Sequence, residues 1–187
     1  MNKKSIFILV ISILFLVASL TFYLFVNSTL SNKEEVGGHF ELPEEEPSNT
    51  KDLEGITYVD FSFEDNSGNL VKLSESKDMA TVVCFWNPDN QDSVDVLKKI
   101  DAMNEKYEET IKFYMINTSD EMPEDLKNSL SIDVYYDKLK EGTSKFYITE
   151  VPSIIYIQKN NEVLHAKAGL TSTDALEANF DILSENF

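Results

Sequence analysis

The sequence predicts an α/β domain over residues 56–187, with a central mixed sheet flanked by helices and a β-hairpin in front. Strand-like and helix-like segments alternate along this part of the chain, which is typical of α/β folds. Residues 81–86 form an unbroken apolar run suited to a central strand buried on both faces. Turn formers follow at 87–90, and from Asp92 to Tyr107 the apolar residues recur at helical spacing. A buried strand leading directly into an amphipathic helix is therefore the core of the predicted fold.

The predicted hairpin precedes this central strand. Residues 57–63 have apolar positions at Tyr58, Phe61 and Phe63, Asp65-Asn66-Ser67-Gly68 supplies a turn, and residues 70–73 form the returning strand. After the helix, residues 111–117 are predicted to form the next strand.

The second half of the domain closes the sheet. A short helix is predicted to open near Pro123, and residues 132–136 could add a strand. Strands are predicted at 151–157 and 162–168, joined by a tight turn, and an amphipathic helix at 173–186 ends the chain. The predicted order is hairpin, βαβ, α, ββα.

The residues before the domain predict a membrane anchor and a linker. Residues 1–4 are a short basic tip, and residues 5–26 carry no charge and are rich in Ile, Leu, Phe and Val. A helix needs about 20 such residues to span a bilayer, whereas the apolar part of a cleaved signal peptide is shorter, so an uncleaved anchor is favoured. The basic tip should stay in the cytoplasm, which places the domain outside. Residues 27–55 are predicted to be an acidic, flexible tether.

Composition excludes one class of partner. The chain has 33 acidic and 16 basic residues, a formal net charge of −17. Nucleic-acid binding depends on clusters of basic residues, and none is present, so nucleic acid is not expected as a partner. Every basic residue is a lysine. This choice indicates the codon usage of an AT-rich bacterium.

A motif at the end of the central strand resembles a known active site. Phe85-Trp86-Asn87-Pro88-Asp89-Asn90-Gln91-Asp92-Ser93 is similar to the Phe-Trp-Ala-x-Trp-Cys-x-x-Cys motif of membrane-anchored TlpA-type thiol-disulfide oxidoreductases, which have the thioredoxin fold. Phe85 and Trp86 match the opening pair. Asn90 and Ser93 stand where that family has its two redox cysteines.

Two further phrases carry the same resemblance. Val151-Pro152-Ser153 resembles the Val-Pro-Thr element of thioredoxin folds, which implies a cis peptide bond before Pro152. Asp65, Gly68, Val71 and Leu73 resemble the hairpin phrase Asp-x-x-Gly-x-x-Val-x-Leu of TlpA-type proteins. Together the three phrases imply a thioredoxin-like fold.

The departure at the active-site motif predicts that the usual chemistry is absent. Disulfide exchange requires a thiolate, which neither Asn90 nor Ser93 can provide. Cys84 is the only cysteine, and its place inside an apolar strand predicts a buried, structural thiol. We expect no catalytic residue and no cofactor.

No metal site is expected either. His39 and His165 are far apart in sequence and have no metal-ligand spacing with the cysteine. Asp89, Asp92 and Asp95 lack the remaining elements of an EF-hand loop, and capping of the following helix explains acidic residues at this place.

The binding surface of the family could persist without its thiols. Trp86, Pro88, Asn90, Val151 and Pro152 are predicted to form a groove that binds extended chains, by analogy with strand addition to exposed backbone. The favoured hypothesis is a membrane-tethered, extracytoplasmic, redox-inactive module that binds a protein or peptide of unknown identity. One alternative is an enzyme of the thiol-disulfide oxidoreductase family that acts through an unrecognised nucleophile or through a partner's thiols. Another is a structural subunit of an envelope complex.

Overall fold

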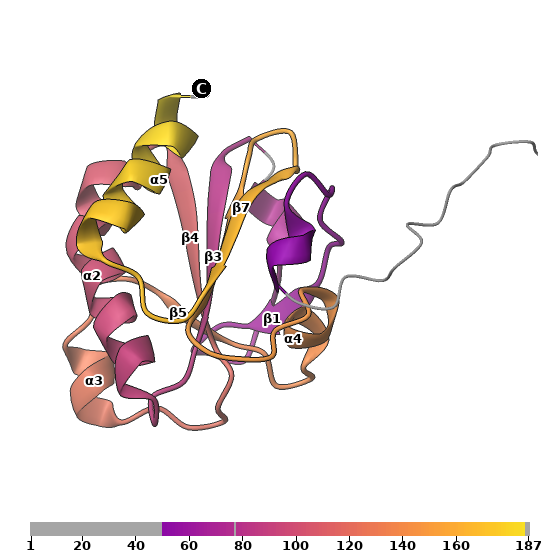
Figure 1. Ribbon diagram of the computed structural model, residues 1–187. Helices are drawn as coiled ribbons and strands as arrows, with labels where there is room; N and C mark the ends of the chain where they lie inside the picture. Colours follow the sequence, from indigo (N-terminus) through magenta and orange to yellow (C-terminus); the bar gives the residue numbers. More distant parts are fainter. Residues whose placement is uncertain (1–49, 77, 186–187) are drawn as a thin grey trace, which may run out of the picture. The chain divides into compact units, whose positions relative to one another are not determined.

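A single mixed sheet organises the part of the chain that the computed structural model describes, residues 50–76 and 78–185. The seven strands lie in the order β2-β1-β5-β4-β3-β6-β7 (Figure 1). The strands are β1 (Ser62–Glu64), β2 (Leu70–Lys72), β3 (Ala80–Trp86), β4 (Ile111–Asn117), β5 (Val134–Tyr136), β6 (Ser153–Ile157) and β7 (Val163–Ala168). The helices are α2 (Gln91–Tyr107), α3 (Glu124–Asn128), α4 (Glu141–Lys145) and α5 (Thr173–Glu185), with 3-10 turns η1 (Thr50–Leu53) and η2 (Leu73–Ser76).

The predicted tip at 1–4, anchor at 5–26 and tether up to residue 49 lie outside the described residues. Within the described ranges, no helix has the length and apolar character needed to cross a bilayer.

Strand β3 is the centre of the sheet, as the sequence predicts. All seven of its residues are buried. It pairs in parallel with β4, from Ala80 opposite Ile111 onward, and antiparallel with β6, where Phe85 lies opposite Ser153. A parallel neighbour requires a crossover, and α2 provides it.

The sheet has two buried faces, because successive side chains of a strand point to opposite sides. On the first, which we call the helix face, Val82, Cys84 and Trp86 of β3 belong to the same core as apolar residues of α2 and α5. On the second, the aromatic face, Val83 and Phe85 lie in a cluster with side chains from the hairpin and the segments around it. Figure 1 shows α2 and α5 together on one side of the sheet and α4 on the other.

The hairpin forms, but its first strand is shorter than predicted. The turn is the expected one: Asp65 accepts hydrogen bonds from the N–H groups of Ser67 and Asn69, both at 2.8 Å, and Gly68 has a positive φ of 81°. The predicted strand over 57–63 is wrong at its beginning. Tyr58 N donates to Asn161 O at 3.1 Å, so this segment pairs with the turn before β7 instead of with β2.

Helix α4 was not predicted, because its stabilising contacts come from outside its own sequence. The buried carboxylate of Asp137 accepts hydrogen bonds from Gly142 N (3.2 Å), Thr143 N (2.7 Å) and Thr143 Oγ1 (2.6 Å). Gly142 also packs closely against an aromatic side chain, since a Cβ at this position would lie 2.3 Å from Cε2 of Phe61. Only a glycine fits between this helix and the aromatic face.

Candidate functional site

The predicted site lies at one edge of the sheet, which we call the carboxyl edge. The parallel strands β3, β4 and β5 end here at Trp86, Asn117 and Tyr136, and the antiparallel β6 begins here at Ser153. In open α/β sheets, binding sites form outside the carboxyl ends of the parallel strands. The loops that leave these strands therefore form the candidate site.

The loop after β3 is a preorganised entry to α2. Asn90 is the N-cap residue, with an extended backbone, and its Oδ1 accepts a hydrogen bond from Ser93 N at 2.8 Å. In the same loop, Asn87 Oδ1 accepts from Asp89 N at 2.8 Å. Each amide side chain satisfies a backbone donor, so local sequence fixes the start of the helix.

Asn90 and Ser93 lie together on the first turn of α2, but their surroundings differ. Asn90 is partly exposed at the carboxyl edge, whereas Ser93 is completely buried. The Ser93 hydroxyl has no hydrogen-bond partner among the described residues. A buried hydroxyl without a partner is costly, so packing alone does not account for a serine at this place.

Trp86 and Cys84 lie inside the protein. Both side chains are completely buried in the helix face. Burial raises the pKa of the Cys84 thiol to about 12, so the reactive thiolate is scarce near neutral pH. Trp86 differs from its predicted role as a groove wall, because it presents no surface to solvent, and its Nε1 has no hydrogen-bond partner within the described chain.

The segment before β6 confirms one sequence prediction. The Val151-Pro152 peptide bond is cis. Since Phe85 pairs with Ser153, the register places Pro152 and Val151 beside Trp86 and the start of the loop to α2. Pro152 O accepts a hydrogen bond from Gly169 N at 2.8 Å, whereas the N–H and C=O of Val151 have no partner among the described residues.

Comparison with solved structures identifies the fold. A thiol:disulfide interchange protein DsbE from Chlorobium tepidum superposes with a TM-score of 0.62 at 19% identity, covering 70% of this chain and 96% of that one. A thioredoxin from Neisseria meningitidis superposes with a TM-score of 0.60 at 22% identity, covering 70% of this chain and 91% of that one. The exposed lipoprotein thioredoxin Etrx1 from Streptococcus pneumoniae superposes with a TM-score of 0.58 at 18% identity, covering 67% of this chain and 100% of that one. The fold is thioredoxin-like. No protein-family model and no curated protein matches the sequence.

Two apolar side chains of the thioredoxin-like domain were missed from the sequence. Leu139 is 79% exposed in the loop after β5, and Leu170 is 53% exposed directly after Gly169. Both loops leave strands that run toward the carboxyl edge, so both leucines belong to the candidate site. The available signal was an apolar residue inside a polar turn, as in Asp137-Lys138-Leu139-Lys140.

Two of the polar residues considered as metal ligands, Asp95 and His165, have other contacts. Asp95 Oδ1 accepts from Gln91 Nε2 at 2.8 Å, and His165 Nδ1 lies 2.5 Å from Glu54 Oε1. His39 lies outside the described residues. Within the described ranges, no three His, Cys, Asp or Glu side chains gather as a metal site would require.

Proposed function

We propose that this protein is a membrane-tethered, extracytoplasmic thioredoxin-like module that binds a protein or peptide and has lost redox catalysis. The observation that carries the proposal is the free backbone of Val151 at the carboxyl edge, beside the first turn of α2. The unpaired N–H and C=O of Val151 offer two hydrogen bonds to an extended chain, as in strand addition.

The side chains around Val151 support binding of a chain with an apolar residue. Pro88 and Asn90 contribute partly exposed surface; at the same edge of the sheet, Leu170 is exposed in the loop after β7, next to β6, and Leu139 in the loop after β5. We propose that these residues form the groove with the partly exposed Val151, and that the buried side chains of Trp86 and Pro152 support it from below.

We infer the loss of redox chemistry from the absence of the two thiols that disulfide exchange requires. One compared structure is described as a thiol:disulfide interchange protein, and such exchange forms and breaks a disulfide through a thiolate. We propose that Asn90 and Ser93 occupy the positions of the two thiols in this chain. The single cysteine, Cys84, cannot replace them, because it is buried and its pKa is raised to about 12.

The membrane location rests on the sequence. Residues 5–26 form an uncharged apolar run of a length suited to a bilayer, and the lysines before it favour a cytoplasmic N-terminus. We therefore propose a single-pass protein whose domain lies outside the cell membrane.

Site-specific photocrosslinking in intact cells tests the binding role. A photoreactive benzoylphenylalanine replaces Asn90 in one full-length variant and Asn160, in the turn between β6 and β7 at the opposite end of the sheet, in the other. We expect discrete crosslinked products from position 90 that are absent from position 160. Equal products at both positions, or none at position 90, would contradict the proposed groove.

A reductase assay tests the loss of catalysis separately. The full-length protein should not accelerate the reduction of insulin by dithiothreitol beyond the buffer rate. A rate increase that disappears in Cys84→Ala would show that the chain is an enzyme acting through its single thiol.

A further inference from the structure

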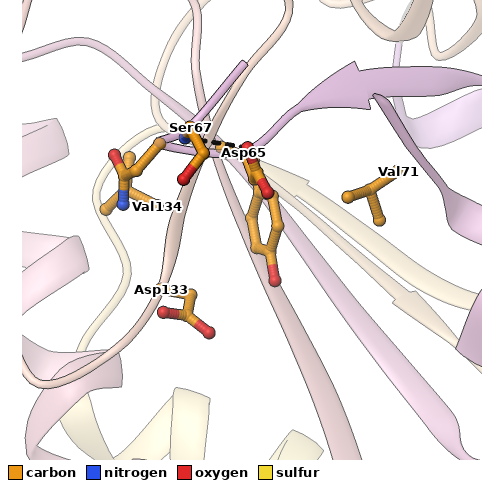
Figure 2. A pocket seen from close by; sticks show the side chains of 7 residues that line it. Asp65, Ser67, Val71, Asp133 and Val134 are labelled. Atoms are coloured by element: carbon orange, nitrogen blue, oxygen red, sulfur yellow. Dashed lines mark hydrogen bonds between the residues drawn. The ribbon is translucent and has the colours of Figure 1, made fainter. Parts of the chain in front are cut away.

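A second concave surface lies away from the carboxyl edge, between the β1–β2 turn and the start of β5. It has a volume of about 270 Å³, and Figure 2 shows the side chains that line it. The pairing of Glu64 with Tyr136 in antiparallel strands brings the hairpin turn next to the beginning of β5. The residues used below are Asp65, Ser67, Val71, Asp133, Val134 and Tyr135.

The turn that forms one wall is rigid. Asp65 accepts hydrogen bonds from Ser67 N and Asn69 N, both at 2.8 Å, and from Asn69 Nδ2 at 2.9 Å. The Asn69 side chain, followed by its backbone N–H, holds the pKa of Asp65 below its ordinary value. This carboxylate therefore stays ionised and fixed in position at neutral pH.

Tyr135 supplies an unused polar group. Its side chain lines the pocket and is only 7% exposed, with its ring packed against Phe63 (5.1 Å between centroids) and Tyr114 (5.3 Å). No residue in the described ranges makes a hydrogen bond with its hydroxyl. Burial, then the charges of Asp133 and Asp65, raise the pKa of Tyr135 to about 12, so the phenol stays neutral and can donate or accept.

The charged side chains that line the pocket are all acidic. Asp65 and Asp133 line it, and no lysine does. Two basic side chains of the surrounding strands have other contacts: Lys138 forms an ion pair with Glu64 at 2.5 Å, and Lys112 Nζ lies 5.6 Å from the ring centroid of Tyr114.

The remaining walls are apolar. Val71 contributes methyl groups and the Tyr135 ring adds an aromatic surface, whereas the Val134 side chain points to the opposite face of the sheet, into the core of the helix face. A bare metal ion would prefer several oxygen ligands over such walls. An ion with a hydrocarbon part fits both the charge and the lining.

We propose that this pocket binds an organic cation, an ammonium or guanidinium group on a short apolar stem. The cationic head is attracted by Asp133 and Asp65 and donates a hydrogen bond to the Tyr135 hydroxyl, while the stem contacts Val71 and the Tyr135 ring. Such a group occurs in small free amines and in the lysine and arginine side chains of a partner. The pocket is separate from the proposed groove, so either proposal can fail alone.

The test is a titration of the full-length, ¹⁵N-labelled protein followed by amide chemical shifts. The probes are n-butylammonium and n-butylguanidinium, with n-butanol as the uncharged control. We expect saturable shifts confined to residues 65–71 and 133–135 with the two cations, and none with the alcohol. A blocked tripeptide Gly-Lys-Gly, compared with Gly-Gln-Gly, tests a partner's side chain as the source.

Substitutions separate specific binding from general attraction to an acidic protein. Asp133→Asn should weaken binding about threefold, as expected for an exposed ion pair, and Tyr135→Phe about fivefold, for one lost hydrogen bond. Asp174→Asn, an equal charge change at the exposed start of α5, should have no effect. Because Asp133 is exposed, its variant should keep the amide spectrum of the rest of the fold. Equal effects of Asp133→Asn and Asp174→Asn, shifts spread over the whole surface, or equal shifts with n-butanol would overturn the proposal.

Discussion

The two faces of the sheet differ in the contacts of their buried side chains. On the aromatic face, Phe61 packs against Phe63, Phe85 and Phe146, with ring centroids 5.3 to 6.2 Å apart. On the helix face, three buried polar atoms have no hydrogen-bond partner in the described part of the chain: Trp86 Nε1, Ser93 Oγ and Tyr156 OH. The aromatic face is thus stabilised by contacts between rings. The helix face, in contrast, contains buried polar atoms that make no hydrogen bond within the described residues. Two of the three flank the loop from β3 to α2, where we place the remnant of a thiol site.

The largest expected effect is on the aromatic face. Phe61→Ala should lower the free energy of unfolding by about 3 to 5 kcal/mol, because it removes a buried ring that three other rings contact. Leu139→Ala is the control: Leu139 is 79% exposed, so the change should stay within about 0.5 kcal/mol. Urea unfolding of both variants measures the difference. Similar losses in the two would mean that the aromatic cluster does not stabilise the fold as described.

Both faces should respond to alkaline pH. Burial raises the pKa of Cys84 from 9.0 to about 12, and the pKa values of Tyr114 and Tyr135 from 10.0 to about 12; the pKa of Tyr156 is also raised. These groups bind protons more tightly in the folded than in the unfolded state, so their stabilisation is complete below the unfolded pKa and decreases as pH rises toward the folded pKa.

The free energy of unfolding should therefore fall as the pH rises above about 9, and Cys84 alone gives a slope of about 1.4 kcal/mol per pH unit. Urea unfolding at a series of pH values measures this slope. Cys84→Ala, which removes a buried group of the helix face, should reduce this slope. Tyr135→Phe, which removes one of the aromatic face, should reduce it as well. A stability that is constant from pH 9 to 11 would contradict the burial of these groups.

A smaller change in the free energy of unfolding should distinguish buried hydroxyls that make a hydrogen bond from those that make none. Ser153 is buried and donates to Glu150 O at 2.7 Å, so Ser153→Ala should cost about 1 kcal/mol. Ser93 is equally buried but has no partner, so Ser93→Ala should be neutral or stabilising by up to about 1 kcal/mol. Chemical unfolding of the two variants gives the sign directly. An equal loss in both would show that Ser93 makes a contact the structure lacks.

The tyrosines offer the same comparison in a second pair. Tyr107 OH donates to Asp181 at 2.6 Å, whereas Tyr156 OH has no partner among the described residues. Tyr107→Phe should therefore be the more destabilising of the two phenylalanine substitutions. Both tyrosines lie in the core of the helix face, so the opposite order would argue against the distinction between satisfied and unsatisfied hydroxyls there.

Sequence patterns predicted the elements that local residues specify. Strand β4 has the bounds predicted for it, and α2 begins one residue early because its N-cap is Asn90. The first hairpin strand was extended too far, because the pairing of Tyr58 with Asn161 depends on segments about a hundred residues apart. Helix α4 was missed because its N-cap residue, Lys140, makes no side-chain cap hydrogen bond, and the carboxylate of Asp137, three residues earlier, caps the helix instead.

The site was predictable to a similar extent. The cis bond before Pro152 was predicted from a short phrase and is confirmed. The role of Trp86 as a groove wall was not confirmed, because the residue is buried, as the apolar run over 81–86 predicts for a central strand covered on both faces. The exposed leucines at the carboxyl edge and the pocket beside Tyr135 depend on which loops the sheet order brings together, and no local pattern contains that information.

The central claim is that Asn90 and Ser93 occupy the places of two thiols in a thioredoxin-like site. The most direct measurement is oxidation of the full-length double variant Asn90→Cys, Ser93→Cys, followed by thiol titration after unfolding. The hydrogen bond from Ser93 N to Asn90 Oδ1 places these residues on one helical turn, so we expect their Cα atoms to fall within the roughly 4.4 to 6.8 Å that a disulfide allows. A matched variant, Asn90→Cys with Asp92→Cys, has side chains that do not face each other and should not close.

The account predicts that the first variant oxidises to an intramolecular disulfide and leaves only the Cys84 thiol titratable, while the matched variant keeps all its thiols. If the Asn90→Cys, Ser93→Cys protein stays folded under oxidation with every thiol still titratable, the loop does not have the geometry of a thioredoxin active site and the central claim is wrong.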